Sequence, residues 1–367
     1  MSTNAVREHA KALRALSFKI GPYRPPSEGG AASLLLQITG NCPWNKCTFC
    51  EMYKGHRFVY RSVDEIKADI DAVAAIRDEI LGASHSLGLG GAISGEIASA
   101  LIAHSEGLSR DPAFVTVFNW LASGGKTAFL QDADSMIMRP PELVDCLHYL
   151  RERLPSLMRV TTYARSRTLA RRMPEQLREI RESGLDRLHI GVETGDGELL
   201  ARIQKGVTPA QHIEGGCKAI AAGFQVSAYW MPDLGGREGR RAHAEQTARV
   251  FSAMNPHYIR SRPLVPRRGT PLFEDFAQGR LTLSSPHERL EELEWMIAGL
   301  EVASRVCFDH AMNGWVDRNG RPLFRRDYDG YLFPAEKPLV LERIREGLAL
   351  NESMHLHPRV LMAAASL

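Results

Sequence analysis

The chain has 367 residues, and 46 Lys and Arg against 43 Asp and Glu leave a net charge of only +3. So small a net charge gives no support for a nucleic-acid or membrane surface. Hydrophobic residues make up 44% of the chain and charged residues 24%, as in ordinary globular proteins. No apolar run is long enough for a membrane span, and the N-terminal residues mix charges without an apolar stretch, which predicts a cytoplasmic protein.

The N-terminal part of the chain leads into a buried strand. Residues 1–30 contain a short helical pattern and a Gly/Pro-rich connection, and we interpret them as an arm. Residues 33–38 form a continuous apolar run, which is typical of a strand buried on both faces. The strand leads directly into a cysteine-rich loop. After the loop, Ser62 and Glu65 have the spacing of a capping box and predict the start of a helix.

Residues 82–126 interrupt the regular pattern. They contain a Gly-rich segment and two helix-like patterns, and we interpret them as a helical insertion. No strand precedes the glycines, as a phosphate-binding turn would require, so we interpret them as a plain loop.

From residue 127 onward, apolar strands alternate regularly with helices. Strands are predicted at residues 127–130, 158–162, 187–192, 225–230 and 258–264. With the first strand they make six, and repeated βα units build parallel sheets with right-handed crossovers. The predicted fold class is therefore α/β, either an open doubly wound sheet or a full or partial barrel. In both architectures ligands gather at the carboxyl ends of the strands.

The C-terminal part, residues 276–367, has a different character. An amphipathic helical pattern is followed by an irregular stretch with scattered aromatic residues and by a last helical pattern. We interpret this part as a mainly helical cap over a core formed by residues 31–275.

Three of the six cysteines lie within nine residues, as Cys42, Cys47 and Cys50. In a reducing compartment, clustered cysteines are more often metal ligands or catalytic groups than disulfides. Three thiolates leave a tetrahedral zinc site one ligand short, and His56 is the nearest candidate for the fourth. A four-iron cluster with three cysteine ligands instead keeps an open position on its fourth iron. The residues alone therefore leave two possibilities open, a zinc- or cluster-stabilised binding module without catalytic activity and a cluster enzyme.

The cysteine loop resembles the cluster motif of the radical S-adenosylmethionine (radical SAM) superfamily. Phe49 directly precedes the last cysteine, and the first gap has four residues where three are usual. In that superfamily the cluster loop follows the first strand of a partial (β/α)6 TIM-type barrel, which is the place of the loop here. The resemblance covers about residues 31–272. It is closest to the branch with coproporphyrinogen-dehydrogenase-like and Elongator-catalytic-subunit-like members.

The resemblance implies two cofactors and a reaction type. One [4Fe-4S] cluster with three cysteine ligands would bind S-adenosylmethionine and cleave it reductively to a 5′-deoxyadenosyl radical. That radical would take a hydrogen atom from a small or medium-sized organic substrate, with group transfer from S-adenosylmethionine as an alternative. An electron donor such as flavodoxin or ferredoxin is implied as a partner. A nucleic-acid partner has no support in the composition, and a membrane is not expected.

The resemblance also implies residues that contact the cofactor at the ends of strands two to five. Where the superfamily has a Gly-Gly-Glu-type segment after strand two, this chain has acidic residues and no glycine pair. The implied cofactor contacts, in addition to Phe49, are Asp132, Asp134, Tyr163, Arg165, Glu193, Met231 and Gly235.

Four further residues are candidates for substrate contacts. Arg260 and Arg262 come at the end of the sixth strand, where a guanidinium group could receive a carboxylate or phosphate. Cys307 could donate a hydrogen atom to a substrate radical, and His310 follows it closely in the C-terminal part. The two remaining cysteines lie on apolar helical faces, where a free cysteine packs as a small hydrophobic residue.

Overall fold

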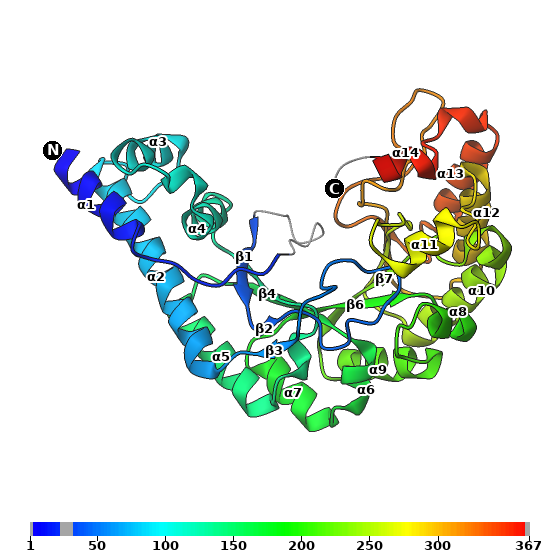
Figure 1. Cartoon of the computed structure of the whole chain (residues 1–367), viewed down its shortest axis with the longest axis horizontal. Coiled ribbons are helices and arrows are strands. Elements are labelled where there is room, and N and C mark those ends of the chain that lie inside the picture. The colour runs from blue at the N-terminus through cyan, green and yellow to red at the C-terminus, as the bar shows by residue number, and fades with distance from the viewer. Residues whose placement is uncertain (1–2, 23–31, 364–367) are drawn as a thin grey trace. The chain divides into compact units, whose positions relative to one another are not determined.

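The structure is a computed structural model of the chain, and it describes residues 3–22 and 32–363 (Figure 1). Residues 23–30 of the predicted Gly/Pro-rich arm lie outside the described residues. The chain divides into two compact units. The first unit contains residues 1–42, 57–163 and 178–187, and the second contains residues 43–56, 164–177 and 188–367. In the part of the chain that the structure describes, no helix has both the length and the apolarity needed to cross a membrane.

The first unit contains three parallel strands, β1 (Leu34–Gln37), β4 (Thr127–Gln131) and β5 (Arg159–Ala164). In the register, Leu34 lies opposite Ala128 of β4, and Leu130 of β4 lies opposite Thr162 of β5. The leucines of β1 are buried, which is the pattern that its continuous apolar run predicts.

The helices of the first unit pack around α2. Helix α1 lies against α2 and α3, and α2 also packs against α4 and α5. Helix α2 begins with the predicted capping box, in which the Ser62 hydroxyl accepts from the Glu65 N–H and the Glu65 carboxylate accepts from the Ser62 N–H. The bounds are α1 (Thr3–Leu13), α2 (Val63–Ser86), α3 (Gly95–His104), η3 (Leu108–Arg110), α4 (Pro112–Ala122), η4 (Ser135–Ile137) and α5 (Pro140–Arg153).

A two-stranded ribbon connects the two ends of the cysteine loop. Strand β2 (Thr39–Gly40) pairs antiparallel with β3 (Val59–Tyr60). The ribbon pairs the residues before the loop with the residues after it, so residues 41–58 form a loop whose two ends lie side by side.

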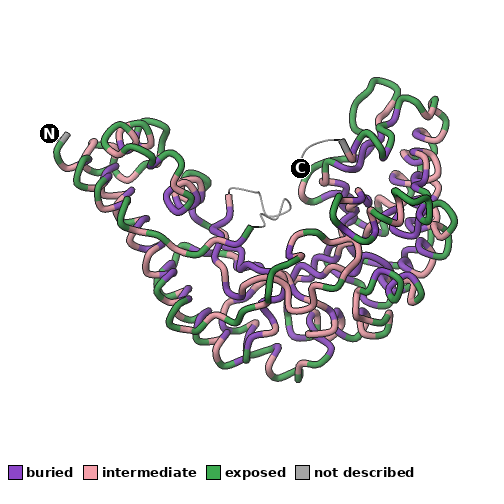
Figure 2. Tube along the Cα trace, in the orientation of Figure 1, coloured by how far each residue is buried: buried purple, intermediate pink, exposed green. Residues whose placement is uncertain are grey.

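The second unit contains β6 (Arg187–Glu193) apart from its first residue, and also β7 (Gln225–Trp230), β8 (Tyr258–Ser261), β9 (Arg305–Cys307) and β10 (Tyr331–Leu332). Strands β7, β8 and β9 are parallel, and β10 runs antiparallel to β9. Strands β7 and β8 are buried over most of their length. Figure 2 shows the burial of the residues along the chain.

The helices of the second unit begin with strong capping signals. The Thr208 side chain caps α9 and the Ser285 side chain caps α12, each in a capping box. Helix α10 packs against α9 and α12, and α12 packs against α13. The bounds are α6 (Ser166–Arg171), α7 (Pro174–Glu182, shared with the first unit), α8 (Gly197–Arg202), α9 (Pro209–Ala221), α10 (Gly236–Met254), α11 (Pro271–Ala277), α12 (Pro286–Gly299), α13 (Lys337–Leu348), η5 (Glu352–Met354) and α14 (Pro358–Ala363).

The strand order is β1-β4-β5 within the first unit and β6-β7-β8-β9-β10 within the second. The six predicted strands are β1 and β4 to β8 in chain order, which confirms the α/β fold class and its βα units. Strands β9 and β10 were not predicted, because three and two residues are too short to show an alternating pattern. Helix α10 begins at Gly236, so Gly235 is its N-terminal flanking residue.

Candidate functional site

The part of the cysteine loop that belongs to the second unit, residues 43–56, is folded onto itself by one asparagine. Asn45 has a left-handed backbone conformation with φ of 47°. Its side-chain amide donates to the carbonyl oxygens of Tyr53 and His56, the latter at 3.1 Å. Nζ of Lys54 donates to the carbonyl oxygen of Asn45 at 3.1 Å. These three contacts tie Asn45 to the later residues of the loop.

The same loop is anchored at three points. The indole Nε1–H of Trp44 donates to the carbonyl oxygen of Gln204 at 2.7 Å, and the Thr48 N–H donates to that of Ile203 at 2.9 Å. The Thr48 carbonyl oxygen accepts from the Leu272 N–H at 3.0 Å. Because these contacts lie between the cysteines, they hold the intervening backbone against the end of α8 and the start of α11.

The three loop cysteines provide a donor set that fits a [4Fe-4S] cluster. The six cysteines form no disulfide bond within the described residues, and Cys42, Cys47 and Cys50 are half-buried. Among the described residues, no group of three or more His, Cys, Asp or Glu side chains forms a ligand set for a single ion. A four-iron cluster binds each thiolate on a different iron, which is a wider arrangement than one ion requires. The assignment of the three cysteines as ligands stays a prediction.

The other cysteines lie elsewhere. Burial raises the pKa of Cys146 and of Cys307 to about 12, so both are neutral thiols near neutral pH. Cys217 is half-buried on α9, where its Sγ lies 3.6 Å from the carbonyl oxygen of Ala253.

Lys205 brings together three of the residues for which cofactor contacts are predicted. Its Nζ lies 2.9 Å from the carboxylate of Glu193 and 5.5 Å from the ring centroid of Phe49. Its carbonyl oxygen accepts from the Arg165 guanidinium at 2.7 Å. Burial alone lowers the pKa of Lys205, but the neighbouring Glu193 and Cys47 more than offset it, so the pKa is raised and the ammonium stays charged. Lys205 was missed because nothing in its local sequence distinguishes it from a surface lysine.

The backbone at the end of β6 is held in an unusual conformation. Glu193 has a left-handed φ of 65°, which is rare for a residue other than glycine. Its carbonyl oxygen accepts from the Met231 N–H at 3.0 Å, and Nε2 of His243 lies 3.3 Å away. A Cβ at Gly191 would approach Oε1 of Glu193 to 2.3 Å, so any side chain at that position would displace the carboxylate.

The segment after β7 is held by a buried network of charged residues. Asp233, with φ of 69°, donates its N–H to both carboxylate oxygens of Glu292 at 3.1 and 2.9 Å. Its own carboxylate accepts from Nε and an Nη of Arg289 at 2.9 and 2.7 Å. Glu292 also lies 2.8 Å from Nδ1 of His243. All four side chains are buried, and burial raises the pKa of Glu292.

This network fixes which atom carries a proton. The Glu193 carbonyl can only accept, so Nε2 of His243 carries a hydrogen. Nδ1 of His243 faces the carboxylate of Glu292 at 2.8 Å. One imidazole ring therefore connects the left-handed Glu193 at the end of β6, through Glu292, to the left-handed Asp233 after β7. Left-handed residues of this kind persist where the surrounding structure holds them, and they gather at functional sites.

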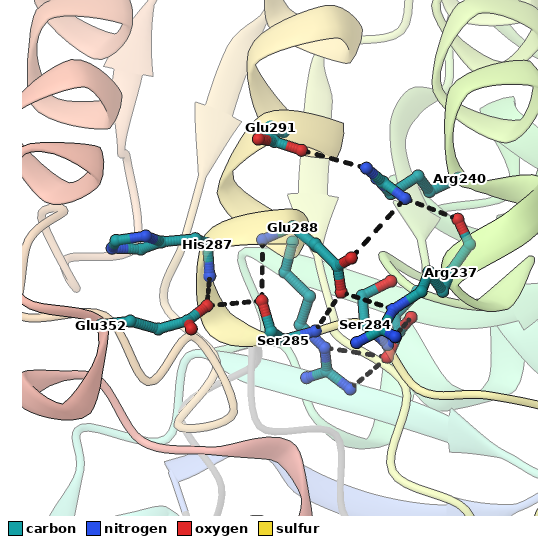
Figure 3. A network of polar contacts seen from close by, with 10 residues as sticks. Arg237, Arg240, Ser284, Ser285, His287, Glu288, Glu291 and Glu352 are labelled. Atoms are coloured by element: carbon teal, nitrogen blue, oxygen red, sulfur yellow. Dashed lines mark hydrogen bonds and ion pairs between the residues drawn. The ribbon is translucent and has the colours of Figure 1, made fainter.

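A second polar network lies directly beside the first and fixes α12 against α10 (Figure 3). The Glu288 carboxylate lies 2.9 Å from Nε of Arg237 and 3.9 Å from an Nη of Arg240. Arg240 also pairs with Glu291 at 3.1 Å. On the other side of the helix start, Glu352 accepts from the His287 N–H at 2.8 Å. These contacts hold the helix that supplies Arg289 and Glu292.

An apolar cluster packs against two of the predicted cofactor residues. Phe49 and Met231 both pack against it, so the structure brings the cysteine loop and the end of β7 to one place. Gly235 follows at the start of α10. The buried members of the cluster are Leu199, Ile203, Leu234, Leu264, Leu272, Leu281 and Leu283.

Three predicted cofactor residues belong to the first unit. The Asp132 carboxylate is buried and accepts from Nε2 of Gln37 at 2.7 Å and from the Asn41 N–H at 3.1 Å. It therefore orders the backbone immediately before Cys42. Asp134 is fully buried ahead of η4, and Tyr163 packs with its ring edge-on to Phe129.

Arg260, a predicted substrate residue, is buried and bound within the protein. Its guanidinium donates to Asp309 at 2.8 Å, to Ser227 at 3.1 Å and to the carbonyl oxygen of Tyr328 at 3.2 Å. Nearby, Sγ of Cys307 lies 3.4 Å from the same carbonyl oxygen. The internal ion pair occupies the charge with which Arg260 would bind a substrate anion.

The other two substrate candidates lie close to each other. Burial, with smaller effects from the neighbouring Arg262 and Arg267, lowers the pKa of His310 to about 4. Arg262 is half-buried, and its N–H donates to the carbonyl oxygen of Trp230 at 3.0 Å. A contact that the sequence did not predict joins Nδ1 of His189 on β6 to the Tyr229 hydroxyl on β7.

Comparison with known proteins gives one family. Residues 122–237 match the profile of the Radical SAM superfamily. This range contains Glu193, Met231 and Gly235, and the cysteine loop lies outside it. A search of curated proteins by sequence finds no match.

The chain is also similar to solved structures at low identity. It matches Elp3 of the archaeon Methanocaldococcus infernus at 15% identity and a TM-score of 0.42, over 60% of this chain and 53% of that one. It matches the radical SAM enzyme coproporphyrinogen III oxidase (HemN) of Escherichia coli at 15% identity and a TM-score of 0.42, over 81% and 55%. Methylornithine synthase (PylB) matches at 14% identity and a TM-score of 0.42, over 95% and 77%. The chain spans about half the length of the first two.

Proposed function

On the premise that this chain is a radical SAM enzyme, we propose that it cleaves S-adenosylmethionine at a [4Fe-4S] cluster held by Cys42, Cys47 and Cys50. When bound and reduced, the cluster would supply the electron that converts S-adenosylmethionine to methionine and a 5′-deoxyadenosyl radical, which takes hydrogen from an organic substrate. The remaining chemistry belongs to the residues of this chain, which must orient the cofactor and keep water out.

One observation carries this proposal. Phe49 from the cysteine loop, Glu193 from the end of β6 and Met231 from the end of β7 come together around Lys205 and one apolar cluster. These residues are 182 positions apart at the extremes, between 49 and 231, and no local pattern places them side by side. Their convergence is what a cofactor site at the carboxyl ends of parallel strands requires.

We assign the roles of these residues as follows. The half-buried thiols hold the cluster, and the loop anchors at Trp44 and Thr48 keep their backbone in place. The raised pKa of Lys205 keeps a cation beside Phe49, where it can face an anionic group of the cofactor. The apolar cluster under Phe49 and Met231 excludes water from this side of the site.

The test is anaerobic reconstitution followed by analysis of iron, sulfide and the visible spectrum. The parent protein is expected to hold about four irons per chain and to release 5′-deoxyadenosine from S-adenosylmethionine after reduction. A Cys47→Ala variant is expected to lose the cluster. Cys217→Ala, which removes a half-buried thiol outside the loop, is the matched control and is expected to keep it.

Two results would contradict the proposal. Stoichiometric zinc without a charge-transfer band would support the binding-module alternative for the cysteine loop. A sample shown by electron paramagnetic resonance to be reduced, but producing no 5′-deoxyadenosine, would rule out the cleavage chemistry.

A further inference from the structure

The surface beside Trp44 is built from the cysteine loop itself. Trp44 lies in the gap between Cys42 and Cys47, and its indole N–H is fixed on the carbonyl oxygen of Gln204 at 2.7 Å. Gly206 has φ of 69°, and a Cβ there would approach the indole ring to 2.2 Å. The absence of a side chain at Gly206 therefore lets the indole ring pack there. Trp44 itself is two residues from Cys42, a predicted cluster ligand.

Positive charge gathers around the ring. Nζ of Lys46 and the guanidinium of Arg165 each lie 5.0 Å from the ring centroid, and the guanidinium of Arg167 lies 5.7 Å from it. Arg167 donates to the carbonyl oxygen of Gly206 at 3.3 Å. Among the described residues, no carboxylate forms an ion pair with Lys46 or Arg167, so their charges are not neutralised locally.

A hollow opens next to these cations. Its volume is about 470 Å³, and Trp44 and Lys46 form one wall. The opposite wall comes from α8 and from the segment that leads into α9, and it is mainly apolar, with Leu200, Val207 and Pro209. The lining of the hollow combines Trp44 and Lys46 with mainly apolar residues, while the two arginines lie at the Trp44 ring. Tryptophan and arginine are both enriched at the centres of protein interfaces.

We propose that an acidic electron-transfer protein, which delivers one electron at a time, docks on the surface around Trp44. This Trp44 surface is defined by Trp44, Lys46, Arg165, Arg167 and the adjoining hollow. The proposal rests on the proposed function, because the cluster needs an external electron and Trp44 belongs to the loop that would hold it. The cations match an acidic partner in charge, and the hollow can receive one of its apolar side chains.

An acidic protein fits this surface better than a nucleic acid does. A nucleic-acid site needs a stripe or patch of cations that follows many phosphates. Here the cations surround one indole ring, and the chain as a whole carries a net charge of only +3. In the transfer itself the carrier loses one electron and the cluster gains one, with no bond formed or broken.

The test compares two reductants of the reconstituted holoenzyme. Flavodoxin in its hydroquinone form is an acidic protein and must dock, whereas dithionite is a small ion that needs no docking surface. The variants are Lys46→Glu, at an exposed position, and Arg167→Glu. The control is Arg249→Glu, which reverses an exposed charge on α10 away from this surface.

We expect Lys46→Glu and Arg167→Glu to slow cluster reduction by flavodoxin about tenfold each at low ionic strength, and added salt to shrink the difference. Reduction by dithionite and all rates of Arg249→Glu are expected to match the parent. The affinity for oxidised flavodoxin, measured by calorimetry, is expected to fall in Lys46→Glu and Arg167→Glu and to stay unchanged in Arg249→Glu. Lys46→Glu decides the matter if Arg167→Glu does not fold.

Equal rates of reduction by flavodoxin in the parent and in Lys46→Glu would overturn the inference. The inference would also be overturned by a second result: the parent binds a single-stranded RNA oligonucleotide, Lys46→Glu does not, and the two are reduced by flavodoxin at the same rate. In both cases the formation of 5′-deoxyadenosine with dithionite would leave the proposed function standing. Its absence with either reductant would instead count against the proposed function.

Discussion

Nε2 of His243 lies 3.3 Å from the carbonyl oxygen of Glu193, and the other ring nitrogen lies 2.8 Å from the carboxylate of Glu292. His243 is therefore a positioning residue that orients the end of β6. Replacing it by alanine removes one of the two donors to the Glu193 carbonyl. We expect the affinity for S-adenosylmethionine to fall about tenfold, the equivalent of about 1.4 kcal/mol.

The readout separates positioning from general damage. The iron content of reconstituted His243→Ala is expected to equal that of the parent, because His243 does not contact the cysteine loop through any of its hydrogen bonds. His148→Ala, at an exposed position on α5, is the control and is expected to bind S-adenosylmethionine like the parent. Unchanged affinity in His243→Ala would refute the positioning role.

The ion pair of Asp233 and Arg289 predicts a large loss of stability when one partner is removed. Asp233→Asn keeps a residue type that tolerates the left-handed conformation, but it leaves the Arg289 charge buried without a counter-ion. The free energy of unfolding is expected to fall by about 3 kcal/mol. The double variant Asp233→Asn/Arg289→Met removes both charges and is expected to recover part of that loss in urea unfolding. A double variant less stable than Asp233→Asn would contradict this account.

The fold was predictable because its strands carry strong local signals. The buried strands are short apolar runs, and the capping residues Ser62 and Thr208 mark helices between them. These signals act within a few residues along the chain, so they predict the α/β class and the six parallel strands β1 and β4 to β8.

The candidate site was predictable only where the resemblance supplied positions. Glu193, His243 and Glu292 are about 50 residues apart in sequence, and their contacts arise from the packing of α10 against α12 and the sheet. No periodicity or motif encodes such a pairing. Arg260 illustrates the same limit, because its partner Asp309 lies 49 residues further along the chain.

The pair of Lys205 and Glu193 is expected to be strongly coupled. Both side chains are mostly buried, so Lys205→Met leaves the Glu193 carboxylate without its cation. A double-mutant cycle with Lys205→Met and Glu193→Gln is expected to give a coupling free energy of about 1–3 kcal/mol in chemical unfolding. The exposed pair of Arg241 and Glu245 on α10 provides the comparison, and its cycle is expected to give less than about 0.5 kcal/mol. Equal coupling in the two pairs would show that burial does not strengthen the first.

His212 predicts a loss of stability in acid. Burial, with smaller effects from Lys205 and Arg165, lowers the pKa of His212 from 6.5 to about 3 in the folded protein. The ring is fully buried, and Nδ1 lies 2.7 Å from the Ser166 hydroxyl. Between pH 6.5 and 3 the unfolded chain binds a proton at this position and the folded chain does not. Stability is therefore complete above pH 6.5 and decreases as the pH falls below it, by about 2 kcal/mol at pH 5.

His212→Gln keeps a neutral polar side chain beside Ser166 and removes this titration. The free energy of unfolding is measured in urea at pH 7 and at pH 5 for the parent and the variant. The decrease between the two pH values is expected to be about 2 kcal/mol smaller in the variant, even if the variant is less stable at pH 7. The exposed His148→Gln is expected to show the same decrease as the parent. Equal decreases in the parent and in His212→Gln would mean that the buried ring accepts its proton in the folded state. The conclusion that His212 is neutral beside Lys205 would then be wrong.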